Sequence, residues 1–116
     1  YYRLPELFCG FSRDESGCMI PISYPVSCSP QAWAAGTMPF LLQVLLGPEP
    51  RAADRRLTLR PVFPDWLTEV TIEGLSFAGR TLSLSVRRQQ GRYILDYQAD
   101  PDITVALAST APVGAA

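Results

Sequence analysis

The hydrophobic and polar positions of the chain change character twice. Residues 1–28 follow neither a 3.6-residue nor a 2-residue period and are broken repeatedly by proline and glycine, which predicts an irregular segment. Ordered loops of this length tend to be binding or active-site segments. A disordered arm is the alternative, and the pattern leaves both interpretations open.

Residues 30–46 are apolar almost without interruption. Ser29-Pro30 is typical of a helix start. The serine oxygen can accept a hydrogen bond from an unpaired amide of the first turn, and proline has no backbone N–H at a position where an N–H would have no partner within the helix. Gly47-Pro48 marks the end. Since apolar side chains occupy the whole circumference, we expect this helix to be buried on all sides by other helices. Its length of ~25 Å and the internal Pro39 argue against a membrane span.

After residue 47 the pattern changes again. Residues 48–55 are polar and proline-bearing and predict a connection between two parts of the chain. From residue 56 onward, apolar and polar residues alternate, as in half-buried strands. Turns are predicted at Ala78-Gly79, Gln90-Gly91 and 100–102, which gives five or six antiparallel strands. We expect the tail from residue 109 to be frayed.

The predicted fold class is therefore α+β. Residues 1–47 form a loop and an apolar helix, and residues 48–116 form a small antiparallel β domain. Charged residues are 18% of the 116-residue chain, below the ~25% of soluble domains, so its surface is under-charged for an independent protein. The chain opens on Tyr1 without methionine or a secretory signal, from which we expect that it begins inside a longer protein.

Charge and composition exclude several function classes. The formal net charge is −1 and the ten basic residues, all arginine, are scattered, so nucleic acid is not an expected partner. Cys9, Cys18 and Cys28 fit neither a disulfide framework nor a zinc site; we expect them to be reduced, mostly buried and cytoplasmic. The chain has no histidine, which removes imidazole-based catalysis. We expect no metal and no cofactor, so any chemistry must rest on carboxylates.

Glu6 is the carboxylate with the most suggestive surroundings. It lies among apolar residues, near Arg3, Tyr1 and Tyr2. Burial would raise the pKa of a carboxyl in such a place and Arg3 would lower it, so a catalytic acid or base and a structural ion pair are both open on composition alone.

Two segments of the chain resemble those of a known protein family. Residues 3–11, Arg-Leu-Pro-Glu-Leu-Phe-Cys-Gly-Phe, and residues 24–33, Tyr-Pro-Val-Ser-Cys-Ser-Pro-Gln-Ala-Trp, resemble the end of amylo-α-1,6-glucosidases, the glucosidase part of glycogen debranching enzymes. The match covers residues 3–47; the strands after residue 56 resemble the small β tail of that family only in pattern. The resemblance implies that the apolar helix is the last helix of an (α/α)6 toroid.

The family is similar to other toroid glucosidases that invert the anomeric centre. In such enzymes one carboxylic acid protonates the leaving oxygen and a second carboxylate activates water from the opposite face. Carried over, Glu6 is the general base, and the acid lies upstream of this sequence, so the isolated chain should be inactive. The partners implied are a branched α-glucan and the rest of the parent chain. Arg3, Gln31 and Trp33 are the candidate substrate-binding residues, although packing is the plainer role for Trp33.

Other charged residues have simpler interpretations. Asp14 and Glu15 occupy a turn-like stretch and predict solvated loop charges rather than the missing acid. Five arginines alternate with apolar residues on the predicted strands, which indicates the solvent-exposed face of a sheet whose other face packs on the core. These are Arg55, Arg56, Arg60, Arg87 and Arg88.

Two alternatives to the enzymatic hypothesis stay open. The strand region could be a non-catalytic β module that binds glycan or braces a helical partner domain. The apolar helix could instead find its neighbours in another copy of the chain, because a helix of this kind is not stable in water. Neither alternative involves a membrane.

Overall fold

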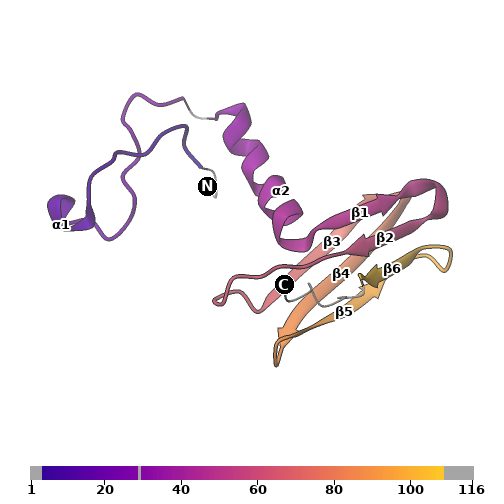
Figure 1. Cartoon of the computed structure of the whole chain (residues 1–116). Coiled ribbons are helices and arrows are strands. Elements are labelled where there is room, and N and C mark those ends of the chain that lie inside the picture. Colours follow the sequence, from indigo (N-terminus) through magenta and orange to yellow (C-terminus); the bar gives the residue numbers. More distant parts are fainter. Residues whose placement is uncertain (1–3, 29, 109–116) are drawn as a thin grey trace, which may run out of the picture. The chain divides into compact units, whose positions relative to one another are not determined.

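The computed structural model describes residues 4–28 and 30–108. It divides into two compact units, Tyr1–Leu41 and Leu42–Ala116, which we describe one at a time (Figure 1). Helix α2, Ala32–Leu46, belongs to both. The division lies within α2 rather than after Gly47, because Leu46 at its end is only 3% exposed and belongs to the core of the second unit.

The predicted apolar helix is present, and it ends at Gly47 as expected. Gly47 adopts φ +52°, and its amide donates to the Gln43 carbonyl at 2.9 Å, so the helix stops at a glycine in the left-handed region. The predicted capping residue, Ser29, lies outside the described residues. The first turn closes with the Ala35 amide donating to the Gln31 carbonyl at 3.0 Å.

The expectation that this helix is buried on all sides is wrong for the described chain. Ala34 and Leu46 are its buried residues, while Phe40 is 61% exposed and Trp33 is 57% exposed. The reason is architectural: the other α-helix of the described residues, α1 at Arg13–Ser16, has only four residues and cannot cover α2. Further large apolar side chains exposed on α2 are Met38, Leu41, Leu42 and Val44.

The second unit contains two three-stranded sheets. The first has the order β1-β2-β6 and the second the order β3-β4-β5. Their bounds are β1 Pro48–Arg51, β2 Arg56–Leu59, β3 Glu69–Phe77, β4 Arg80–Gln89, β5 Arg92–Gln98 and β6 Thr104–Leu107, with a 3-10 turn at Ala52–Asp54.

Two details of the first sheet correct the sequence-based expectation. Residues 48–51 were predicted as a connection, yet they form β1, paired with β2 from Pro48↔Leu59 to Arg51↔Arg56. Its prolines are tolerated because β1 is an edge strand. Strand β6 runs parallel to β2, not antiparallel, because it returns to this sheet only after the chain has passed through β3, β4 and β5. Alternation reveals a strand but not its direction.

The second sheet matches its prediction closely. Both connections are two-residue hairpins: Ala78 and Gly79 have φ +50° and +75°, and Gln90 and Gly91 have φ +51° and +74°. Positive φ at both turn positions matches the right-handed twist of the strands. A bulge interrupts β3 after Ile72, where Gly74 adopts φ +69° and its amide donates to Ser83 Oγ at 3.2 Å.

The hydrophobic core of this unit draws on both sheets. Val86 of β4 is fully buried, and Leu59 of β2 and Leu82 of β4 are each 1% exposed. These side chains alternate with polar ones along their strands, as the sequence pattern indicated. Other core residues are Leu46, Leu57, Phe63, Leu84, Ile103 and Val105.

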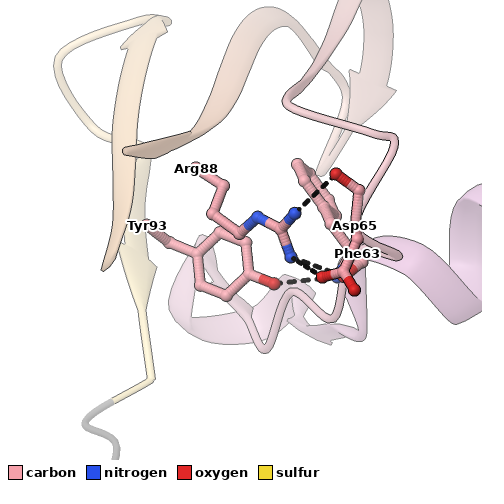
Figure 2. A network of polar contacts seen from close by, with 4 residues as sticks. All are labelled: Phe63, Asp65, Arg88 and Tyr93. Carbon is pink, nitrogen blue, oxygen red and sulfur yellow. Dashed lines mark hydrogen bonds and ion pairs between the residues drawn. The ribbon is translucent and has the colours of Figure 1, made fainter. Parts of the chain in front are cut away.

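A polar network fixes the segment between β2 and β3 (Figure 2). The Phe63 amide donates to Tyr93 Oη at 2.8 Å, and Arg88 donates to the carbonyls of Phe63 at 3.0 Å and Asp65 at 2.9 Å. The rings of Phe63 and Tyr93 meet edge to face at 5.2 Å. Arg88 was predicted to lie on the wet face, but its side chain is only 23% exposed, because the bent segment supplies carbonyls that satisfy the guanidinium.

The other four of these arginines lie at the surface, as predicted, and three of them pair with carboxylates. Arg55 pairs with Asp102 and Arg87 with Asp96. Arg60 Nε lies 2.5 Å from Glu49 Oε1 and links β2 to β1. The hydrogen bond from Arg60 holds the pKa of the Glu49 carboxyl below its usual value. Exposed pairs of this kind contribute little to stability.

Candidate functional site

The first unit is held together by a short backbone clamp. Residues 7–9 run antiparallel to residues 22–24, with the Cys9 amide donating to the Ile22 carbonyl at 2.8 Å and the Tyr24 amide to the Leu7 carbonyl at 3.0 Å. The clamp closes the intervening residues into a loop whose ends are adjacent. The ends of this loop carry Glu6 and the segment that leads into α2.

The loop inside the clamp contains α1. Ser12 caps this helix: its hydroxyl accepts from the Glu15 amide at 3.2 Å, and Glu15 Oε2 accepts from the Ser12 amide at 3.2 Å. This reciprocal pair is a capping box. Asp14 and Glu15 are exposed, so the structure gives them the solvated, structural role that the sequence predicted.

Glu6 is tied to the start of the helical segment. Its Oε2 accepts a hydrogen bond from the Cys28 backbone amide at 2.7 Å, across 22 positions of sequence. The distance is at the short end for an N–H donor to a carboxylate. Glu6 is half-buried, with the exposed apolar residues Leu4 and Leu7 near it in the chain. The contact joins the two segments on which the family resemblance depends.

A tight turn delivers the Cys28 amide to this position. The Ser27 amide and hydroxyl both donate to the Tyr24 carbonyl, at 3.1 Å and 2.9 Å. Pro25 suits this turn, because its fixed φ is the one that the second residue of a type I or II turn requires. Cys28 follows immediately, and α2 begins four residues later.

The Glu6 carboxylate also acts on the Cys28 thiol. The Glu6 side chain, first by hydrogen bonding and then by its negative charge, raises the pKa of the thiol above its usual value. The raised pKa favours the neutral thiol over the thiolate. The expectation that the cysteines are mostly buried is wrong: Cys18 and Cys28 are exposed, and all three thiols are unpaired. The loops that carry them pack too little apolar surface to cover them.

The predicted site residues are only partly brought together. Arg3 lies outside the described residues. Gln31 is half-buried directly before α2, and Trp33 lies in the first turn with 57% of its surface exposed. The contact of Glu6 is with Cys28, on the same segment. Sequence reasoning missed Cys28, because a backbone amide donor carries no side-chain signal and its acceptor is remote in sequence.

The surface of the second unit has two features that bear on binding, a hollow and an exposed tryptophan. A hollow of about 260 Å³ is bounded by residues 81–83 and 98–100, but its carboxylate, Asp100, is already paired with Arg80 at 3.1 Å. On the segment between β2 and β3, Trp66 is 79% exposed and Val62 is 71% exposed. The sequence did not single out Trp66 as functional.

Within residues 4–28 and 30–108 no cluster of three or more potential metal ligands is present. In the same part of the chain, no helix has the length and apolar character needed to cross a bilayer. Comparisons with protein-family models, with characterised proteins and with solved structures give no match. The residues and geometry of the chain itself must therefore support any functional interpretation.

Proposed function

We propose that this chain is part of a glycoside hydrolase of the amylo-α-1,6-glucosidase type, which cleaves α-1,6 branch points of glycogen-like glucans with inversion. Glu6 is its general base. The proposal depends on one observation above all: the hydrogen bond from the Cys28 amide to Glu6 Oε2 at 2.7 Å. It fixes a carboxylate against the segment that leads to Gln31 and Trp33, where the resemblance expects the sugar.

The chemistry assigned to Glu6 is simple. Its carboxylate takes a proton from a water molecule as that water attacks the anomeric carbon, and a second carboxylic acid protonates the departing glycosidic oxygen. Inversion needs the two carboxyl groups ~6.5–9.5 Å apart, with room for the water between them. We assign the acid to another part of the enzyme, so that the chain alone is inactive. No metal or cofactor enters this scheme.

The surface of α2 supports a surrounding helical layer. At 100° per residue, its exposed large apolar side chains spread over an arc of roughly 200° around the axis. A single flat partner, or a second copy packed on one side, covers only a stripe of about half that width. Several neighbouring helices cover the whole arc, as the last inner helix of an (α/α)6 toroid requires. The side chains are Trp33, Met38, Phe40, Leu41, Leu42 and Val44.

The test is Glu6→Gln in the complete enzyme. Glutamine keeps the size of the side chain and an acceptor for the Cys28 amide, but it cannot take a proton. Hydrolysis of branched dextrin should fall by roughly 10²- to 10⁴-fold while dextrin binding is retained. Glu15→Gln, which removes an exposed carboxylate of α1, is the matched control and should leave turnover unchanged. Normal turnover by the Glu6→Gln enzyme would remove the proposal.

A second role belongs to the β unit itself, which we propose braces the helical part of the enzyme. Trp66 supports this role, because it is 79% exposed on a segment that Arg88 and Tyr93 hold in place. A pre-ordered tryptophan is a common anchor of protein interfaces. Backbone contact with α2, from the Val62 amide to the Leu45 carbonyl at 2.8 Å, makes the segment continuous with the end of that helix.

Trp66→Ala tests whether Trp66 contacts the helical part of the enzyme or is simply exposed to solvent. In the isolated chain the substitution should change the free energy of unfolding by no more than ~0.5 kcal/mol, since most of the ring is in water. In the complete enzyme it should lower the melting temperature by several degrees, measured by calorimetry. Equal melting temperatures of the two complete enzymes would contradict bracing. Saturable binding of maltoheptaose by the isolated chain, lost in Trp66→Ala, would favour a glycan-binding module instead.

We further place the enzyme in the cytoplasm. Its three cysteines are unpaired in the structure, and the cytoplasm keeps exposed thiols such as Cys18 reduced.

A further inference from the structure

We propose that Arg51 and Arg56 form a binding site for a phosphoryl group at one end of the β1-β2-β6 sheet (Figure 1). The two arginines lie directly opposite each other in the antiparallel pairing of β1 with β2. Thr104 of β6 lies beside Arg56 on its other side. All three residues are exposed. The site belongs to the β unit and does not depend on the glucosidase assignment.

The buried residues of the sheet fix this arrangement. Leu57 follows Arg56 and is 3% exposed, and Val105 follows Thr104 and is 5% exposed. Because successive side chains of a strand point to opposite faces, Arg56 and Thr104 lie on the face that is turned away from the core. Arg51 is in register with Arg56 and shares that face. A shift of one residue would bury Arg56 and expose Leu57, so the core holds the three residues in one row.

The turn between β1 and β2 returns the chain so that the two arginines meet. The Arg55 amide donates to the Ala52 carbonyl at 3.2 Å, and Arg55 adopts φ +48°, a left-handed conformation that reverses the backbone directly before Arg56. The Arg55 guanidinium pairs with Asp102. The Asp102 carboxylate is therefore engaged by Arg55, and Arg56 is left to face Arg51.

The facing arginines carry positive charge that the chain does not neutralise with an ion pair. Like charges directly opposite in a sheet are destabilising. Within residues 4–28 and 30–108, Arg51 and Arg56 form no ion pair, whereas five other arginines each pair with a carboxylate. These are Arg55, Arg60, Arg80, Arg87 and Arg88.

Two carboxylates lie near this end of the sheet. Glu49 is two positions before Arg51 on β1, but its Oε1 already binds Arg60 Nε at 2.5 Å. Asp54, in the turn, is exposed and forms no ion pair within the part of the chain that the structure describes. Both reduce the local positive charge, yet neither bridges Arg51 and Arg56.

The spacing and chemistry of the two arginines fit a phosphoryl group better than a carboxylate. Directly opposite residues have Cβ atoms ~4.5–5.5 Å apart, so both guanidinium groups can reach one small anion. A carboxylate neutralises one of them. A phosphate monoester carries a charge of about −1.5 to −2 at pH 7 and three acceptor oxygens, and thus serves two planar guanidinium groups at once. The Thr104 hydroxyl can donate to a further oxygen.

NMR titration of the 116-residue chain tests the site, with inorganic phosphate and glucose 6-phosphate added separately at constant ionic strength. The guanidinium signals of Arg51 and Arg56 and the Thr104 amide should shift and saturate with a roughly millimolar dissociation constant, because exposed charges are screened. Saturation by both ligands supports a site for the phosphoryl group alone. Saturation by the ester only supports a site for sugar phosphates.

Arg56→Gln should weaken binding on the order of 10-fold, since it removes one of the two charges and its paired donors. Arg92→Gln removes the same charge from an exposed position on β5 and is the matched control, which should bind as the unchanged chain does. Arg56→Lys keeps the charge without the planar donor pair and should recover only part of the affinity.

Three results would overturn the proposal. The first is unchanged affinity in Arg56→Gln while the remaining amide spectrum shows an intact sheet. The second is a linear, non-saturating shift of all arginines alike, which indicates ionic screening and no site. The third is equal saturation by succinate, a dianion without a phosphoryl group, because two carboxylates would then bind as well as one phosphate.

Discussion

Leu59→Ala should destabilise the β unit by about 3–5 kcal/mol. Leu59 is 1% exposed and lies on β2, the central strand of its sheet, opposite Pro48 of β1 and Leu107 of β6. Truncation removes most of a buried side chain and leaves a cavity that two hydrogen-bonded neighbours prevent from collapsing. Because a domain has only roughly 5–15 kcal/mol of stability in all, this loss is a large fraction of the total.

Urea unfolding followed by far-ultraviolet circular dichroism measures the effect. The matched control is Leu41→Ala, the same truncation on α2, where the leucine is 44% exposed. It should change the free energy of unfolding by less than ~1 kcal/mol. Equal losses at the two positions would mean that the β2 core is not packed as described.

Gly47→Ala should destabilise the same unit by about 2–5 kcal/mol. Two costs combine. Gly47 adopts φ +52°, where any residue with a Cβ pays roughly 1–2 kcal/mol. A Cβ there would also lie 2.6 Å from the Arg60 carbonyl oxygen, a contact with backbone that cannot rotate away, and overpacking of this kind costs typically 1–3 kcal/mol.

The chain offers a control that separates these two costs. Gly74 has φ +69°, but a Cβ at this position would meet nothing within 4 Å. Gly74→Ala should therefore show the backbone cost alone, and the difference between the two variants measures the contact with Arg60. Gly47→Asn supplies a residue that tolerates positive φ while keeping the Cβ, so it should recover only part of the loss. Equal destabilisation by Gly47→Ala and Gly74→Ala would refute the close approach.

A substitution that displaces the backbone at Gly47 would disturb more than the end of α2. Arg60 donates from its amide to the Leu46 carbonyl at 2.9 Å and the Gly47 carbonyl at 3.1 Å, and its guanidinium pairs with Glu49. The helix end, β1 and β2 therefore meet at this glycine. Displacement there disturbs the pairing that turns residues 48–51 into a strand.

Local chemistry made several elements predictable from the sequence. Apolar residues between a proline start and a glycine stop specify α2, and alternation between tight turns specifies β3, β4 and β5, because these signals act over a few neighbouring residues. The Ala78-Gly79 and Gln90-Gly91 hairpins follow from the same local rules. Glu6 could be selected as a candidate from its neighbours and from the family resemblance. The residue that binds its carboxylate, Cys28, could not be predicted.

Long-range pairing decided the rest. The strand at Pro48–Arg51 forms because it can pair with the edge of β2. The parallel direction of β6 follows from the path of the chain through the other sheet. Arg88 is partly buried because the 61–68 segment folds over it. The hydrogen bond between Glu6 and Cys28 likewise depends on a clamp between residues 7–9 and 22–24. The sequence by itself determined most of the stretches that become helix, strand and turn; only the tertiary structure decided that residues 48–51 form a strand and which elements meet, because contacts between distant residues leave no periodic trace in the chain.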